Sequence, residues 1–572
     1  MTTIQDLGLT TVANKEQFLD SVIIKECPGV GRSLVTKKQL TPGDVVLVEE
    51  PLIKYRLNPS CRSSNSPYYS KKLWNNIMWM VQSEEGYDDD KESIYSNSST
   101  NSSYSDGSNN DNQTTQSDFC PGVPAAILAY LDLYPPFPVK NQRKYNKQDF
   151  EFFYYPNLDH PTVQLIRSVT QKVVDTEPLF SHVDPQDLCR FVLKIYANAH
   201  TVTIPSLRKE PTHSKRKARR LFYQSKFGES TSWGSDNRDT SSMPTIALLR
   251  WGSKFAHSCS PNMFLRYEPT KNVMIFTVIR PVKEGEVLSF SYLPEDDSTV
   301  GGLLCGSTED RQAKLEKFKF FTCACERCSD WDWSRSVNCP ACGHDCYSRL
   351  GQWKCFECER KYEDKEIEFL SNEQDVVQTV IGFITRVYGG RRLDQNTMSS
   401  LEPQLMDMLN GQVPKHHWTY GLIHSLLAAY HLQIFPQMYG KGLASQLGLT
   451  AKGIEEALVY IDFLNNVIFK HANPKSPSHG NPMTAFFASW KLLAIVIDLV
   501  MDNTVDKYAN KESIVLIPLD KEWIEPLCKI TDIIHSEWLP LIEQIFPSQR
   551  PVVIEDMIRQ LQAFYDRVQK TK

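Results

Sequence analysis

The 572-residue sequence lacks an excess of charge of either sign, because 63 Lys and Arg residues oppose 68 Asp and Glu residues for a formal net charge of −5. Such a balance gives no general attraction to nucleic acid or to an anionic surface. Hydrophobic residues make up 41% of the chain. Its length predicts about two to four domains with separate cores. We therefore expect a multidomain soluble protein whose bulk charge names no partner.

Long hydrophobic runs are also missing. The longest one, residues 490–501, contains Lys491 and Asp498 and is shorter than the ~20 residues that cross a bilayer, so it predicts a buried helix and no membrane span. Residues 1–10 have neither a basic start nor an apolar stretch, so we expect no secretory signal and a location in the cytoplasm or the nucleus. Disulfides are disfavoured there, and clusters among the 15 cysteines are more often metal sites.

Two segments have few large apolar residues. Residues 83–118 consist mainly of Ser, Asn, Asp and Gly and cannot offset their ordering entropy, which predicts a disordered insertion. Residues 206–242 are polar and contain the basic run KRKARR at 215–220. A run of this kind is typical of a nuclear import signal, of a phosphate-binding patch or of a solvated loop, and all three interpretations stay open.

Strand patterns occur on both sides of these insertions. Short apolar segments of β type lie at 21–24 and 45–48, separated by glycine-containing turns. Two further segments, 273–278 and 287–292, flank a Lys-Glu-Gly-Glu turn at 283–286. This arrangement predicts a β-hairpin that leads into a buried strand.

Helical periodicity predicts helices around 71–81 and 185–197. Beyond residue 365 the pattern is helical throughout, with amphipathic spacing at 454–468 and apolar helices near 420–434, 484–501 and 521–570. We therefore expect an all-α C-terminal region after the β-rich part.

Three cysteines, Cys323, Cys325 and Cys328, lie so close in sequence that their sulfurs can converge on one ion. Tetrahedral zinc requires four ligands, so a fourth must come from elsewhere in the chain. The alternative is a set of unrelated buried thiols.

A second set of cysteines forms two Cys-x-x-Cys pairs, as in zinc ribbons. The pairs are Cys339 with Cys342 and Cys355 with Cys358. A redox dithiol would require a βαβ context that this sequence lacks. His344 and Cys346 lie between the pairs and are alternative ligands. We expect both zinc sites to be structural, because four thiolates leave no open coordination position.

Four motifs occur in one order along the chain: Gly29-Val30-Gly31, His257-Ser258-Cys259-Ser260-Pro261-Asn262, Ser291-Tyr292-Leu293 and Cys323-x-Cys325-x-x-Cys328. In this order they resemble the signature of SET domains with their post-SET cysteines. The long insertion, the residues 196–200 (YANAH) and the helical residues 426–430 (LLAAY) resemble the SMYD class. The cysteine ribbon makes the SmydA branch the most similar one. No MYND finger is detectable, because residues 54–118 contain only Cys61.

The resemblance, which spans roughly residues 20–500, implies an α+β fold with a split β-rich SET domain, a helical insertion, a post-SET zinc site, a zinc ribbon and an all-α C-terminal domain. The expected segments are an N-terminal extension (1–20), the N-terminal SET part (21–82), the disordered insertion (83–118), the helical insert (119–205), the polar and basic insertion (206–242), the C-terminal SET part (243–293), the post-SET segment (294–330), the zinc ribbon (331–364) and the helical domain (365–572).

The resemblance also implies a protein-lysine N-methyltransferase that transfers a methyl group from S-adenosylmethionine to a lysine of a histone or non-histone protein. It makes Tyr292 the catalytic tyrosine and Cys259 the fourth ligand of the first zinc site. The cofactor contacts that it implies are Gly29, Val30, Gly31, Asn198, Ala199, Ala256, His257 and Phe321.

Three positions depart from the family pattern. Ala256 replaces an asparagine that contacts the cofactor, Lys319 replaces a tyrosine of the lysine channel, and His200 replaces a phenylalanine. Ala256 and Lys319 favour an alternative, a weak or inactive SET scaffold that binds protein partners through its C-terminal helices. Nucleic-acid binding through residues 215–220 or the ribbon is a third alternative.

Overall fold

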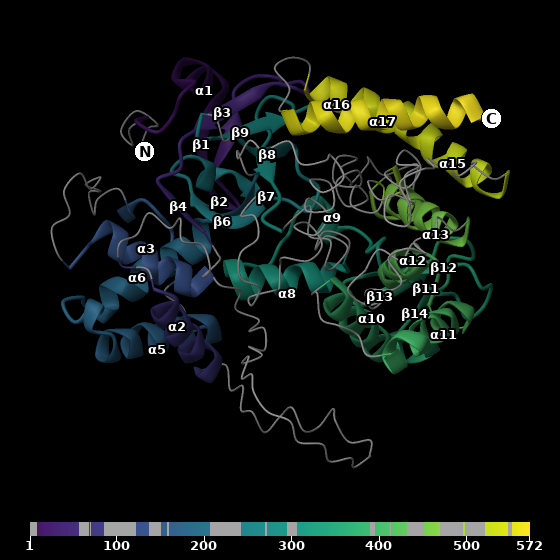
Figure 1. Cartoon of the computed structure of the whole chain (residues 1–572), viewed down its shortest axis with the longest axis horizontal. Helices are drawn as coiled ribbons and strands as arrows, with labels where there is room; N and C mark the ends of the chain where they lie inside the picture. Colours follow the sequence, from purple (N-terminus) through teal and green to yellow (C-terminus); the bar gives the residue numbers. More distant parts are fainter. Residues whose placement is uncertain are drawn as a thin grey trace, which may run out of the picture.

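The structure, a computed structural model, describes residues 9–56, 68, 70–84, 122–136, 150–156, 159–205, 242–268, 271–293, 306–388, 395–411, 413–431, 451–469, 493, 496–497, 521–546 and 552–571. The predicted disordered insertion lies outside these residues apart from 83 and 84, and the predicted basic insertion lies outside them apart from 242. Figure 1 shows a β-rich centre with the helices of residues 71–198 on one side and those of residues 373–462 on the other.

Within the residues that the structure describes, four small sheets make up the β-rich centre. The strands are β1 (Val22–Cys27), β2 (Gly31–Thr36), β3 (Val45–Glu49), β4 (Ile53–Arg56), β5 (His200–Pro205), β6 (Ser242–Leu248), β7 (Ala256–His257), β8 (Met263–Glu268), β9 (Val273–Val278) and β10 (Ser289–Phe290). Their spatial orders are β1-β2, β3-β9-β8, β4-β6-β5 and β10-β7, and only the last pair is parallel. The strands predicted near 21–24, 45–48 and 273–278 are confirmed as β1, β3 and β9.

The predicted hairpin between 273–278 and 287–292 is wrong. Both edges of β9 are already occupied, by β3 and β8, so no edge is left for the segment after the turn. That segment pairs instead with β7 through β10 and forms a bridge between Val287 and Val35. The side chain of Asn262 completes its pairing, because Nδ2 donates to Val287 O and Oδ1 accepts from Ser289 N.

An aromatic core holds these sheets together. The rings of Phe255 and Phe276 stack with centroids 4.2 Å apart, and Phe290 meets Phe276 edge to face. Helix α1 (Lys15–Ser21) adds Phe18, which is fully buried against Trp251. Residues 9–20, expected as an extension, thus contribute to this core.

A buried carboxylate fixes the chain just before β7. Glu49 accepts hydrogen bonds from the backbone N–H groups of Arg250, Trp251 and Gly252 and from the hydroxyl of Thr11. Burial raises the pKa of Glu49, and these four donors oppose that rise. The segment that leads into β7 is therefore anchored to β3.

Four helices, α2 (Lys71–Glu84), α3 (Gly122–Leu133), α5 (Pro161–Thr176) and α6 (Pro185–Asn198), share one apolar core, so α2 of the N-terminal SET part packs with the helices of the expected insert. The helices predicted around 71–81 and 185–197 are confirmed as α2 and α6. Helix α6 begins at the N-cap Asp184, whose carboxylate accepts from Gln186 N. Its C-terminal end carries Asn198 and leads directly into β5.

Helix α8 (Thr308–Lys319) ends abruptly. Its first turn is capped by Ser307, and its last residue precedes Phe320, which has the left-handed φ of 63°. This reversal separates Lys319 from Phe321 and directs the chain toward α9 (Glu326–Ser329). A hydrogen bond from Gln312 to Cys323 O fixes the segment between the two helices.

The cysteine ribbon forms a separate antiparallel sheet. Its strands run in sequence order as β11 (Ser336–Asn338), β12 (Asp345–Arg349), β13 (Gln352–Cys355) and β14 (Lys361–Tyr362). Trp353 and Val337 are buried in its small core beside the cysteines.

The elements described after residue 364 are helical. They are α10 (Glu373–Tyr388), α11 (Gln395–Gly411), α12 (Trp418–His431), α13 (Ala451–Asp462), the π-helical η9 (Phe463–Phe469), α15 (Lys521–Ile533), the π-helical η10 (Ile534–Trp538), α16 (Leu539–Ile545) and α17 (Val552–Thr571), with the short 3-10 helices η7 (Asp364–Glu366) and η8 (Glu368–Ser371) before them. The ring of Phe546, which follows α16, contacts Phe264 of β8, and Figure 1 shows α17 extending from the β-rich centre to the far end of the molecule.

No helix within the described ranges is both long and apolar enough to span a bilayer. Of the predicted helix at 484–501, the structure describes only Leu493, Val496 and Ile497, all buried in the C-terminal core.

Close packing between α12 and η9 generates a prediction for the C-terminal helices. A Cβ added at Gly421 would overlap the ring of Phe463, whereas a Cβ at Gly382 in α10 would meet no heavy atom within 4 Å. We expect Gly421→Ala to destabilise the protein by about 1–3 kcal/mol through overpacking. Thermal unfolding followed by circular dichroism measures the change.

Gly382→Ala is the matched control, because it adds the same methyl group to a helix with free space. It should leave the unfolding temperature unchanged or raise it, as alanine is the better helix former by about 1 kcal/mol. Equal destabilisation by both substitutions would contradict this packing.

Candidate functional site

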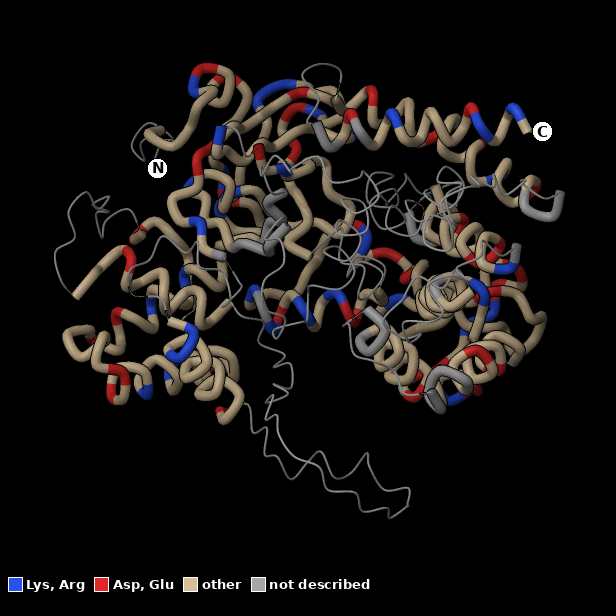
Figure 2. Tube along the Cα trace, in the orientation of Figure 1, with Lys and Arg blue, Asp and Glu red and all other residues tan. Residues whose placement is uncertain are grey.

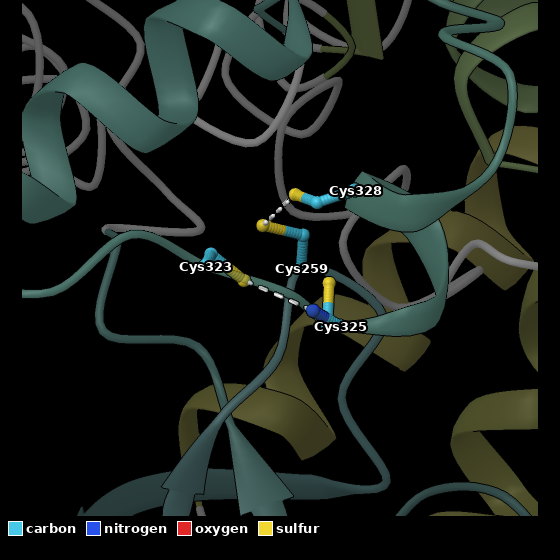
Figure 3. Close-up of side chains that lie close together, drawn as sticks. All are labelled: Cys259, Cys323, Cys325 and Cys328. Atoms are coloured by element: carbon cyan, nitrogen blue, oxygen red, sulfur yellow. Dashed lines mark hydrogen bonds between the residues drawn. The ribbon is translucent and has the colours of Figure 1, made fainter. Parts of the chain in front are cut away.

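Four cysteines from two distant segments converge behind β7. Cys259, Cys323, Cys325 and Cys328 place their sulfurs within 4.8 Å of one another (Figure 3). Zinc bonds of about 2.3 Å in a tetrahedron separate sulfurs by about 3.8 Å, and the Cys259 and Cys328 sulfurs lie 3.6 Å apart. The structure thus brings together the four residues predicted as the first zinc site, and their spacing fits the metal.

Two buried arginines lie beside this cluster. Arg311 is fully buried, with Nη2 3.7 Å from the Cys328 sulfur, and Arg327 donates to Cys259 O. Burial alone would lower the pKa of Arg311, but the thiolates of Cys259 and Cys328 hold it above its usual value. A zinc ion with four thiolates carries two negative charges, so the cations suit a metal-bound cluster. No sequence pattern indicated Arg311, because its role depends entirely on contacts with distant residues.

The ribbon holds the second group, Cys339, Cys342, Cys355 and Cys358, again within 4.8 Å. The sulfurs of Cys339 and Cys358 lie 3.6 Å apart, and those of Cys342 and Cys355 lie 3.5 Å apart. Cys346 is buried beside this group without belonging to it.

The other residue considered as a ligand, His344, is exposed and directs Nδ1 toward Cys342 O. Tyr362 places its hydroxyl 3.1 Å from the Cys339 sulfur. Among the described residues, the predicted cysteines therefore remain the candidate ligands of this second group.

Tyr292 lies between the first cysteine cluster and the aromatic core. Rings surround it, with centroids 5.1 Å away for Phe290, 5.1 Å for His200, 5.3 Å for His257 and 6.2 Å for Phe321. Its hydroxyl donates to Phe255 O at 2.6 Å. Burial raises the pKa of Tyr292, so the phenol stays protonated at neutral pH.

The imidazole of His257 connects Tyr292 to the cysteine cluster. Nδ1 accepts from the backbone N–H of Tyr292 at 2.9 Å, and Nε2 lies 3.3 Å from the Cys259 sulfur. Since Nδ1 is the acceptor, the neutral ring carries its hydrogen on Nε2 and directs it at the Cys259 sulfur. Burial lowers the pKa of His257 to about 4, which keeps the ring neutral. His257 thus joins a candidate metal ligand to the backbone of the predicted catalytic tyrosine.

The end of α6 forms another wall of the site. Both amide hydrogens of Asn198 are used, in bonds to Tyr154 O and Lys194 O, which leaves its Oδ1 as the acceptor for a ligand. The ring of His200 meets Phe290 edge to face and lies tilted against Tyr292. Its buried Nε2 has no hydrogen-bond partner among the described residues. Burial, followed by the charge of Lys319, places the pKa of His200 well below its usual value.

Lys319 projects from the end of α8 into the same site. Its ammonium donates to Ala199 O at 2.7 Å and to Tyr196 O at 3.2 Å, and it lies 5.7 Å from the centre of the Tyr292 ring. Burial of the ammonium lowers the pKa of Lys319 to about 7. Lys319, which departs from the family pattern, is therefore a titratable group beside Tyr292.

The remaining predicted positions belong to β7 and to the β1–β2 turn. Ala256 is buried in β7, where its N–H donates to Leu288 O. Gly29 and Gly31 have φ of +74° and +80°, a region that favours glycine, and a Cβ at either would meet no heavy atom within 4 Å. Val30 between them is 51% exposed. This turn offers open backbone, but no hydrogen bond or ring contact among the described residues joins it to Tyr292.

The sequence also gave no sign of Lys254, which precedes β7. It is buried, with Nζ 4.2 Å from the centre of the Phe152 ring. Burial, followed by the charge of Arg32, lowers the pKa of Lys254 to about 8. The charge of Arg32, the residue after the Gly29–Gly31 turn, therefore acts on the side chain of Lys254 just before β7.

Residues 31–293 match the SET domain family. The chain therefore contains a SET domain. It is 34% identical over 82 residues to a SET domain-containing protein of Acanthamoeba polyphaga mimivirus, covering 14% of this chain and 28% of the relative. It is 40% identical over 76 residues to a potential protein lysine methyltransferase of Saccharomyces cerevisiae, covering 13% of this chain and 18% of the relative. The chain thus spans less than a third of the length of either curated relative.

The SET domain contains Tyr292, His257, Cys259 and Asn198, whereas Phe321 lies beyond its matched residues. The other cysteines of both clusters also follow the SET domain in the chain. The structure nevertheless brings Phe321 into ring contact with Tyr292 and His257. The candidate site is therefore completed by residues outside the SET domain.

The two cysteine groups generate a prediction for metal content. Purified protein should contain two zinc ions per chain, one for each group. Cys328→Ser and Cys355→Ser should each reduce the content to one, because a tetrahedral site loses affinity with a thiolate. Elemental analysis by inductively coupled plasma mass spectrometry measures the ratio.

Cys346→Ser is the matched control in the ribbon, since Cys346 is buried beside the second group but outside it. It should retain both ions. Loss of one ion in this variant would instead make Cys346 a ligand.

Proposed function

We propose that this chain is a protein-lysine N-methyltransferase of the SMYD class that uses S-adenosylmethionine and carries two structural zinc ions. The observation that carries the proposal is the position of Tyr292, whose backbone is held by His257 and whose ring contacts Phe321. These residues come from segments far apart in sequence, and the family resemblance implied a role in the site for each. The name of the yeast relative supports the same activity.

The residues present fit the cofactor. The Oδ1 of Asn198 can accept from its amino group, and the ring of Phe321 offers an apolar face for adenine. The open backbone of the turn at Gly29 and Gly31 allows a ligand to approach closely. When bound, S-adenosylmethionine supplies an electron-poor methyl group on a sulfonium.

The protein then has to position an uncharged lysine amine in line with that methyl group and exclude water. The Tyr292 hydroxyl is fixed by its bond to Phe255 O, and its oxygen keeps lone pairs that can accept from the amine. Because burial raises the pKa of Tyr292, the phenol acts as a neutral hydrogen-bonding group.

The first zinc site would contribute indirectly. Zinc would hold Cys259, whose sulfur faces His257, and His257 in turn holds the backbone of Tyr292. Loss of the ion would loosen the wall that contains Phe321, because the bonds from the metal would join Cys259 to the three later cysteines.

The wider architecture supports the SMYD assignment. A helical insert lies between β4 and β6, and a cysteine ribbon and many helices follow the SET domain. The ribbon favours the SmydA branch. We propose a lysine of a histone or non-histone protein as the acceptor and the C-terminal helices as the surface for other protein partners. A location in the cytoplasm or the nucleus stays a prediction.

Tyr292→Phe separates binding from transfer. The variant should bind S-adenosylmethionine within about threefold of wild type, because ring contacts remain, but transfer methyl groups at least about 100-fold more slowly, since the hydroxyl is lost. Isothermal titration measures the first effect, and radiolabelled methyl incorporation into lysine-bearing peptide arrays measures the second.

Tyr347→Phe is the matched control, because it removes a buried hydroxyl in the ribbon that contacts His416. It should change neither quantity. Folded, zinc-loaded wild-type protein that binds no S-adenosylmethionine would contradict the proposed function and favour the scaffold alternative.

A further inference from the structure

Lys319 places a cation in the transfer site without a matching anion. Among the described residues, no carboxylate forms an ion pair with Lys319, whose ammonium donates to the backbone oxygens Ala199 O and Tyr196 O. The titratable groups that face it are His200 from β5, His257 from β7 and Tyr292 after β10. Both histidines have lowered pKa values and Tyr292 a raised one, so all three are neutral near pH 7.

A cation at this place acts differently on the two forms of the cofactor. S-adenosylmethionine carries a positive sulfonium, and S-adenosylhomocysteine, the product, has a neutral thioether at the same position. The ammonium lies beside Tyr292, where the methyl group would be transferred. Its charge would repel the sulfonium and weaken binding roughly 10- to 100-fold. The adenosine, amino and carboxylate groups are common to both molecules, so only the sulfonium form is disfavoured.

We propose that Lys319 is a specificity-determining residue that selects between the two forms by charge, so that its ammonium weakens binding of S-adenosylmethionine and spares S-adenosylhomocysteine. The inference rests on the proposed function and deepens it. The protein would thus be strongly inhibited by its product, and its activity would follow the ratio of methyl donor to product. The two bonds to Ala199 O and Tyr196 O keep the ammonium in place beside Tyr292.

The selection depends on pH in a defined direction. Burial lowers the pKa of Lys319 to about 7. Below this value the side chain is charged and the sulfonium is disfavoured, and above it the neutral amine no longer repels the cofactor. The affinity for S-adenosylmethionine relative to S-adenosylhomocysteine should therefore rise as the pH increases through about 7.

The test compares the dissociation constants of both molecules by isothermal titration at about pH 6 and about pH 8.5. For the wild type, the ratio of the constant for S-adenosylmethionine to that for S-adenosylhomocysteine should fall at least about fivefold between the two pH values. Lys319→Met removes the charge at similar length and should give the low ratio at both. Lys319→Arg retains a permanent charge and should give the high ratio at both.

Lys317→Met is the matched control, since Lys317 lies in the same helix outside the ring contacts of Tyr292. It should behave as the wild type. A ratio that changes neither with pH nor with Lys319→Met would overturn the inference while leaving the proposed function intact. If the folded wild type binds neither molecule, the proposed function fails and the inference fails with it.

Discussion

The candidate site depends on two contacts of the His257 imidazole, one with Tyr292 and one with Cys259. The ring holds the backbone of Tyr292 through Nδ1 and faces the Cys259 sulfur through Nε2. The first contact belongs to the SET domain core, and the second reaches a cluster completed by cysteines more than 60 residues later. A single neutral ring thus couples metal binding in the post-SET segment to the position of the tyrosine.

The two sides of this region each contain a buried basic side chain, Arg311 beside the cysteines and Lys319 beside Tyr292. On the cysteine side, buried Arg311 offsets the negative charge expected of a thiolate cluster. On the tyrosine side, Lys319 donates to backbone oxygens and faces the Tyr292 ring, and burial lowers its pKa to about 7. An arginine that stays charged therefore lies beside the candidate metal site, whereas a lysine that can lose its proton lies beside Tyr292.

Much of the fold was accessible from local sequence patterns. Helices α2 and α6 follow from apolar periodicity, because each buries one stripe of its residues. Strands β3 and β9 follow from short continuous apolar runs, and β9 is buried along its whole length. The hairpin after β9 was wrong for a physical reason: periodicity predicts a strand but not its partner. Here the partner is β7, and the side chain of Asn262 completes the pairing.

The sequence by itself determined the cysteine groups and the candidate tyrosine, since close spacing of thiols and an ordered set of motifs restrict what the chain can form. Only the tertiary structure decided that Cys259 lies with the later cysteines, that His257 bridges to Tyr292 and that Arg311 is buried beside Cys328. It also showed that Lys319, which the sequence marks as a departure from a motif, places its ammonium beside Tyr292. These facts depend on contacts between residues far apart in the chain, which local propensity cannot encode.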